Sequence, residues 1–538
     1  MKNNVLTRPA IYMFFISLLS FFAIGTARAS DPGENADLLL RKDSVNLKTD
    51  VYKPRVSVPS IKPDGAIEVS VEDAILLALE NNRALFLERI RPLIKKTYED
   101  EESALFDPVL NSSLGYSRES SEEKSKDLES SIRQRDSSSE AVIGVSKYFP
   151  TGTEAGIDIS YNKSWSNKYS DWHESRVGLS ITQALLRGMD VNANLASIRQ
   201  AVLDTVISEY ELRGFAEFLV SQVEETYWDY AREQMRIKIF EESLDLVEQY
   251  LRETEEMINV GKLAETELTA VQAERALRQQ DLINARSSLE TRKLQLIRLL
   301  NPPCSNPWDR DIRLLNGPIV PRVILDDVNA HVEVSLRMRS EVNEARLRLR
   351  HGDLEIVKTK NGLLPKMDLF INLGKSGYAD SFSSSVRDID ENSYDISVGL
   401  NFQYPFHNRE AKALHKRALL SRDQLVRALE NLSQLIETDV RAAYIEVNRA
   451  KQQISASAAT RKLQEEKLRI EEEKFRVGRS TNFLVAQVQR DLVSSQISEV
   501  EAVVGYLKAL VELHRLEGSL LERRGIIAPG REPVEAIP

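Results

Sequence analysis

Apolar residues recur with helical spacing over four stretches of the 538-residue chain. Two stretches are very long, 187–259 and 408–476, and each is followed by a shorter one, 264–300 and 480–518. At 1.5 Å per residue, the long stretches predict helices of about 100 Å. In 264–300 the seam alternates steps of three and four residues with Arg292 as its only charged member, which is the coiled-coil pattern. We therefore expect each long helix to pack along the shorter helix that follows it.

Two regions, 109–184 and 368–404, change from helical spacing to a period of two. From Tyr394 to Tyr404 apolar and polar residues alternate, so one face of the predicted strand suits lipid and the other suits water. Segment 120–139 is rich in Ser, Glu and Lys and is predicted to be a loop. Up to six strand candidates result. The four in the first region are 110–116, 141–149, 155–162 and 177–182.

The N-terminal residues predict export. Two basic residues precede an apolar run from 11 to 24, and Ala27-Arg28-Ala29 has the form of a cleavage site, so 1–29 is predicted to be a signal peptide. The run is shorter than the roughly 20 residues that a membrane-spanning helix needs, and no later apolar stretch is long enough either. The polar, proline-containing segment 30–66 is predicted to be a flexible lead-in.

A further helix precedes the first strands. Ser70 has the character of an N-cap, and apolar residues continue with helical spacing to about Leu105. Pro92 lies inside this stretch and is the candidate position of a kink.

The chain repeats itself. Residues 246–301 align without a gap on 463–518, and Val260-Gly261-Lys262 falls opposite Val477-Gly478-Arg479. Each half is therefore predicted to have the order helix, strands, very long helix, tight turn and long helix, which is one fold unit used twice. The predicted boundaries are 67–301 for the first repeat, 302–322 for a linker, 323–518 for the second repeat and 519–538 for a C-terminal tail.

Charge and composition exclude several classes of function. The 82 acidic and 72 basic residues are interleaved and form no basic stripe that would bind nucleic acid. Cys304 is the only cysteine and the six histidines stand alone, so the sequence offers no metal site. It also has no phosphate-binding glycine loop and no G-x-S-x-G nucleophile motif. We expect no cofactor, no catalytic residues and no enzymatic activity.

Several short motifs, taken in their order and spacing, resemble the outer-membrane efflux protein family, the TolC-like ducts. They are the two duplicated turns, the strand-to-helix segment Thr182–Gly188, Leu363-Leu364-Pro365 before a strand, and Asp73-Ala74 at the start of the first helix. The resemblance covers roughly Ile67–Glu517. Ala184 stands where members commonly have proline, a departure that occurs in the first repeat only.

The resemblance implies a mainly α fold with a β-barrel portion. Three copies would each give four strands to a shared twelve-strand barrel in outer-membrane lipid, and their coiled-coil helices would form a periplasmic α-barrel. A periplasmic adaptor and an inner-membrane transporter would complete a tripartite efflux pump or a type I secretion system. Since the sequence has six strand candidates, the hairpin Ala141–Lys163 is the candidate to lie outside the barrel.

The duplicated turns are the first candidate site. Glycine at 261 and 478 fits a reversal that needs positive φ. The resemblance implies that the hairpin tips also contact the adaptor. The candidate contact residues are Val260, Gly261, Lys262, Val477, Gly478 and Arg479.

Acidic clusters precede both turns and are the second candidate site. Such runs usually form a solvated helix face. The alternative hypothesis is that some of these carboxylates point into the lumen, where threefold symmetry would make a ring that favours cations. The clusters are Glu253, Glu255 and Glu256 in the first repeat, and Glu471, Glu472 and Glu473 in the second.

A soluble periplasmic coiled-coil scaffold is the alternative function. It would explain the long helices but leave the alternation of Tyr394–Tyr404 without a role. It would also not explain the cluster of Trp165, Tyr169 and Trp172, since such aromatic residues suit a membrane interface. The sequence therefore favours an outer-membrane channel that extends into the periplasm.

Overall fold

The computed structural model describes residues 66–535, except for 125–130, 168–169, 262, 305, 323 and 390–391. The predicted signal peptide and nearly all of the predicted lead-in lie outside the described residues. Within the described residues, no helix is both long and apolar enough to cross a membrane.

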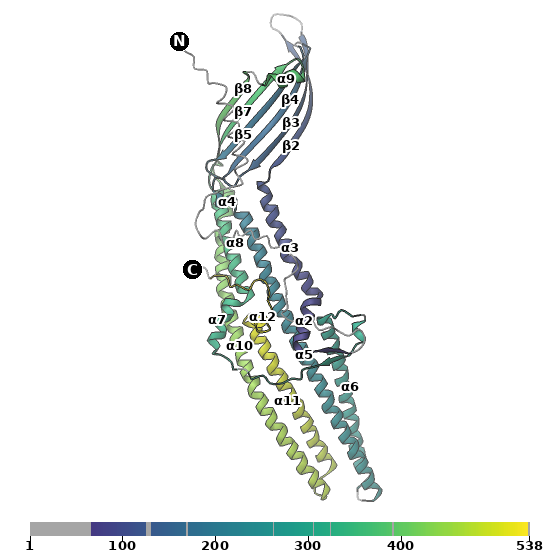
Figure 1. Cartoon of the computed structure of the whole chain (residues 1–538). Helices are drawn as coiled ribbons and strands as arrows, with labels where there is room; N and C mark the ends of the chain where they lie inside the picture. Colours follow the sequence, from purple (N-terminus) through teal and green to yellow (C-terminus); the bar gives the residue numbers. More distant parts are fainter. Residues whose placement is uncertain are drawn as a thin grey trace. The chain divides into compact units, whose positions relative to one another are not determined.

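Two helical hairpins contain the four longest described helices (Figure 1). In the first, α5 (Ala196–Asn259) packs on α6 (Thr266–Leu300), and in the second, α10 (Arg409–Arg476) packs on α11 (Asn482–Leu516). With 64 and 68 residues, α5 and α10 are each about 100 Å long.

The remaining helices are shorter, and most of them pack against the hairpins. α8 packs on both α5 and α10, while α3 packs on α5. A parallel pair of short strands, β1 (Ile67–Val69) and β6 (Ile312–Leu314), lies beside them. The shorter helices are α2 (Val71–Asn81), α3 (Arg83–Ser103), α4 (Val191–Asn194), α7 (Val328–Met338), α8 (Ser340–Gly362), α9 (Phe382–Asp388) and α12 (Leu520–Arg523).

The first helix is interrupted at Asn82 and not at Pro92. The Asn82 side chain accepts hydrogen bonds from the backbone N–H groups of Ala84 and Leu85, so it caps α3, and its amide donates to the carbonyl oxygen of Leu299 over 3.0 Å. Pro92 lies within α3. The prediction of one continuous helix from Ser70 to Leu105 is therefore wrong, because the Asn82 cap and its tertiary partner decide where the helix breaks.

Six antiparallel strands form one sheet in the order β2-β3-β4-β5-β7-β8 (Figure 1). Each strand is hydrogen-bonded to its neighbour in continuous register. The strands are β2 (Val109–Lys124), β3 (Ser131–Tyr148), β4 (Thr153–Ser166), β5 (Trp172–Ala184), β7 (Lys366–Ala379) and β8 (Tyr394–Gln403).

Two predictions about the strands are corrected by this sheet. The predicted loop 120–139 belongs largely to β2 and β3, whose polar side chains pair across the hairpin: the Ser117 and Ser138 hydroxyls lie 2.8 Å apart and Arg133 donates to Glu122 over 3.1 Å. Paired backbones need no buried face to remain strands. The Ala141–Lys163 hairpin does not stand apart either, because β3 and β4 lie inside the continuous sheet. The sheet thus has six strands, where the resemblance implied four.

The register gives the sheet one apolar and one polar face. One row across all six strands is entirely apolar, and the adjacent row, which points to the opposite face, is polar or glycine. The apolar row is Leu110, Val145, Ile157, Leu179, Leu373 and Ile396. The polar row is Asn111, Gly144, Asp158, Gly178, Gly374 and Asp395.

An arginine lies along the polar face between two carboxylates. Arg176 on β5 contacts Asp395 on β8 over 3.0 Å and Asp158 on β4 over 3.4 Å. A β-carbon at Gly178 or Gly374 would lie within 2.7 Å of the guanidinium group. The two glycines therefore leave the space in which this side chain crosses the sheet.

Short connections join the sheet to the helices. The Leu185 amide donates to the Met367 carbonyl oxygen over 2.7 Å, and the Asn408 side chain donates to the Leu363 carbonyl oxygen over 3.1 Å. Both long helices begin at this junction and run away from it. The turns that follow α5 and α10 consequently lie about 100 Å along each helix from the sheet.

The apolar core lies between the hairpins and the shorter helices. Val220, Val223 and Tyr227 of α5 are buried in one cluster with Leu296 of α6 and Leu520 of α12. A second cluster surrounds α10 and α11. Beyond α12, the chain stays attached to the helices, since Arg346 donates to the Val534 carbonyl oxygen over 2.8 Å. The segment predicted as a C-terminal tail is thus packed against the helical part as far as residue 535.

Candidate functional site

The two hairpin turns have the same backbone geometry. α5 ends at Asn259 and α10 at Arg476, a separation of 217 residues that equals the offset of the repeats. Gly261 has φ of 71° and Gly478 has φ of 74°, a region that glycine adopts without steric strain. Each glycine N–H donates over 2.9 Å to the carbonyl oxygen three residues before it. The same short motif therefore ends both long helices in the same way.

The predicted contact residues of both turns are exposed where the structure describes them. Val260 is 67% and Val477 is 68% exposed, which is unusual for valine and leaves an apolar side chain at each tip. Arg479 is exposed as well, and its backbone N–H donates to the Lys474 carbonyl oxygen over 2.8 Å. Lys262 lies outside the described residues.

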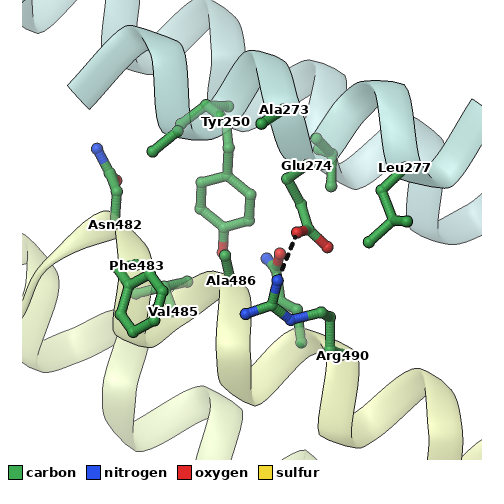
Figure 2. A pocket seen from close by; sticks show the side chains of 13 residues that line it. Tyr250, Ala273, Glu274, Leu277, Asn482, Phe483, Val485, Ala486 and Arg490 are labelled. Atoms are coloured by element: carbon green, nitrogen blue, oxygen red, sulfur yellow. Dashed lines mark hydrogen bonds and ion pairs between the residues drawn. The ribbon is translucent and has the colours of Figure 1, made fainter. Parts of the chain in front are cut away.

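A groove of about 410 Å³ lies between the two hairpins near these turns (Figure 2). Its walls come from α5, α6 and α11 and are mostly apolar, with Phe483 61% exposed at its edge. The other apolar lining residues include Val247, Val271, Leu277, Val485 and Ala486.

Two polar contacts cross between the hairpins at the groove. Arg490 of α11 binds Glu274 of α6 over 3.2 Å, and Figure 2 shows this ion pair beside the Tyr250 ring. The Tyr250 hydroxyl of α5 donates to Glu472 of α10. Burial raises the pKa of Tyr250, and Glu472 raises it further, so this hydroxyl keeps its proton as a donor.

Sequence reasoning missed these contacts for a definite reason. The repeat offset pairs Tyr250 with Lys467, and Glu274 with Asp491. The contacts therefore join positions that are not equivalent in the two repeats, and neither the duplication nor the helical periodicity identifies them.

The acidic residues of the second repeat have partners within the chain. Glu471 accepts from Ser480 and pairs with Lys474 over 3.0 Å, and these contacts lower its pKa. Glu472 binds Tyr250 as described, and the exposed Glu473 pairs with Arg476 over 3.5 Å. Of the three, Glu473 is the carboxylate least engaged by other elements.

Breaking both contacts between the hairpins is expected to loosen the turns. In the double variant Tyr250→Phe with Arg490→Gln, amide hydrogen exchange over 240–280 and 465–490 should accelerate, by about fivefold for each contact if each contributes about 1 kcal/mol. Arg469→Gln is the matched control, because Arg469 pairs over 2.6 Å with Glu466 on the same helix. Equal exchange in the double variant and the control would contradict a role for these contacts.

Metal chemistry has no site in the described part of the chain, where no group of three or more His, Cys, Asp or Glu could hold an ion. The sequence profile of the outer membrane efflux protein family matches residues 77–302 and 332–519, which include most of both repeats. No curated protein matches the chain by sequence.

Several solved outer-membrane channels share the fold. One is CusC, whose crystal structures concern the conformational changes that accompany folding and transmembrane channel formation. It has a TM-score of 0.62 and 17% identity, and the match covers 86% of this chain and 99% of that chain. The CmeC outer membrane channel of Campylobacter jejuni has a TM-score of 0.62 and 14% identity, with 87% and 94% covered. The MtrE outer membrane channel of Neisseria gonorrhoeae has a TM-score of 0.58 and 15% identity, with 87% and 97% covered.

The family match favours a channel over a soluble periplasmic scaffold. A scaffold would also give no role to a sheet with one apolar and one polar face. It also confirms the resemblance that the duplicated turns and their spacing indicated. The chain belongs to the outer membrane efflux protein family and is an outer-membrane efflux channel that extends into the periplasm.

Proposed function

We propose that three copies of this chain form a passive export conduit, the outer component of a tripartite efflux pump or a type I secretion system. The observation that carries the proposal is the sheet with one apolar and one polar face, joined by short connections to helices of about 100 Å. A lipid-facing wall and a water-facing wall suit a pore. Helices of this length suit a passage through the space between two membranes.

The hairpin tips are the proposed contact with a periplasmic adaptor, which would connect the conduit to an inner-membrane transporter. Two observations support this role: the exposed valines at 260 and 477, and the apolar groove between the hairpins. The proposed contact residues remain Val260, Gly261, Lys262, Val477, Gly478 and Arg479. No step of this function needs a cofactor, and the family to which the chain belongs consists of channels.

Purification tests the proposal directly. We expect the mature protein to need detergent for extraction from membranes, to give the mass of three copies by native mass spectrometry, and to conduct ions in a planar bilayer. Release by high salt alone, or a protein that stays monomeric in detergent and forms no pore, would contradict the conduit.

The same recordings test the proposed acidic ring of Glu471, Glu472 and Glu473. The triple glutamine variant should lose part of the preference for cations if these carboxylates line the lumen. An unchanged reversal potential under a salt gradient would remove the ring and leave the carboxylates with their contacts inside the chain.

A further inference from the structure

We infer that the barrel of this channel contains eighteen strands, six from each copy, and that each seam pairs β8 of one copy with β2 of the next. The inference rests on the proposed trimer and specifies how its membrane wall is built. It departs from the twelve strands that the sequence resemblance implied.

The register places all six strands in the same two-sided environment. The apolar row runs without interruption from Leu110 on β2 to Ile396 on β8, and the polar row beside it runs from Asn111 to Asp395. A hairpin outside the barrel would have no reason to continue both rows. β2 and β3 therefore belong to the wall as fully as β7 and β8.

The two edge strands leave open hydrogen-bonding groups. Among the described residues, β2 pairs only with β3, and β8 pairs only with β7. Unpaired strand edges are too costly to remain inside a membrane, so each edge needs a partner. A second copy of this chain supplies one, because an even number of alternating strands makes β2 and β8 run in opposite directions. Pairing of β8 with the next β2 then continues the antiparallel order around a closed ring.

The side chains at the two edges match such a seam. Leu110, Leu114 and Tyr116 on β2 are exposed, and they lie on the same face of the sheet as the exposed Ile396 and Val398 on β8. Joining the edges extends one apolar band across the boundary between copies. The polar faces of the two strands meet on the other side.

Eighteen strands make a wider barrel than twelve. With strands about 4.8 Å apart and tilted by about 40°, the backbone diameter is about 36 Å, against about 24 Å for twelve strands. Barrels of 16 to 18 strands hold a water-filled channel. The polar face is suited to this, because Gly178 and Gly374 let Arg176 lie along the sheet instead of projecting from it. A barrel of this diameter would let larger cargo through than a twelve-strand barrel would.

Disulfide cross-linking of the trimer tests the seam. In a Cys304→Ser background, Leu110→Cys, Ser112→Cys or Leu114→Cys is combined in turn with Ile396→Cys, Val398→Cys or Leu400→Cys, all on the apolar face. Antiparallel neighbours lie close enough for a disulfide. Because the strands are antiparallel, a cysteine further along β2 should cross-link to one earlier along β8. We expect the pairs that follow this register to give covalent trimers on a denaturing gel, and the other pairs not to.

Two control sets make the result specific. Asn111→Cys with the same β8 cysteines should not cross-link, because Asn111 points to the opposite face. The second control combines Ile157→Cys on β4 with the β8 cysteines. If β2 and β3 lay outside the barrel, β4 would be the edge strand that meets β8 of the next copy, and this combination would cross-link.

Cross-links from β4 to β8, covalent species that stop at a closed dimer, or a conducting trimer without any β2–β8 cross-link would each overturn the eighteen-strand wall. A protein without a trimer or a pore would instead refute the proposed function.

Discussion

Replacing Arg213 with methionine is expected to destabilise the protein by about 3–5 kcal/mol, the usual cost of breaking a buried ion pair. The Arg213 side chain is 0% exposed and joins α5 to the end of the chain. Its guanidinium donates to Glu522 over 2.7 Å and to the Gly518 carbonyl oxygen over 3.2 Å. Methionine fills a similar volume but leaves both acceptors without their donor. The measurement is thermal unfolding of the detergent-solubilised protein, followed by circular dichroism, with a transition lowered by several degrees.

Glu217→Gln is the matched control in the same cluster. Glu217 lies 3.2 Å from Arg213, but burial outweighs this attraction and raises the pKa of Glu217 to about 8. The carboxyl group is therefore largely neutral at pH 7, and glutamine should cost little there.

Glu217 also makes the stability of the protein depend on pH. Because the unfolded chain ionises Glu217 near 4.5, its contribution to stability is full below that pH and is lost as the pH rises towards 8. The glutamine variant should lose this pH dependence; a wild-type protein equally stable from pH 5 to 8 would contradict the assignment.

Replacing both Leu520 and Leu521 with alanine is expected to have the second large effect. Both side chains are 0% exposed and belong to the core cluster that surrounds α5. A buried leucine-to-alanine change costs about 2–5 kcal/mol, so the pair should cost about 4 kcal/mol or more. We expect little mature trimer in the outer membrane, measured by quantitative immunoblotting of fractionated cells.

Ile527→Ala is the control for this pair. Ile527 follows the buried Ile526 but is 48% exposed, so its truncation should cost less than about 1 kcal/mol. Equal trimer levels in the double variant and this control would show that α12 contributes nothing to the fold.

The helices and turns could be predicted because their signals are long or repeated. A period of 3.6 maintained over more than sixty residues outweighs local ambiguity, as in α5 and α10. The turn motifs occur twice at one offset, and this repetition alone identifies Gly261 and Gly478 as turn residues. Their positive φ angles follow the prediction from glycine.

The strand ends and the contacts between hairpins could not be predicted. The outer halves of β2 and β3 have an almost entirely polar sequence, so alternation gives no signal there, and only pairing with the neighbouring strand makes them strands. Asn82 breaks the first helix because it has a partner on α6, which periodicity cannot show. Tyr250 and Arg490 likewise depend on how the two hairpins pack.

Two glycines, Gly178 and Gly374, determine how Arg176 lies on the polar face of the sheet. Arg176 spans from Asp158 to Asp395 only because positions 178 and 374 carry no β-carbon. A β-carbon at either position would lie within 2.4 Å of an aspartate oxygen and within 2.7 Å of the guanidinium group, so these side chains would have to move. At this height of the proposed conduit one arginine is held against two aspartates, and the space that it occupies is left by glycine, a residue that itself carries neither charge nor bulk.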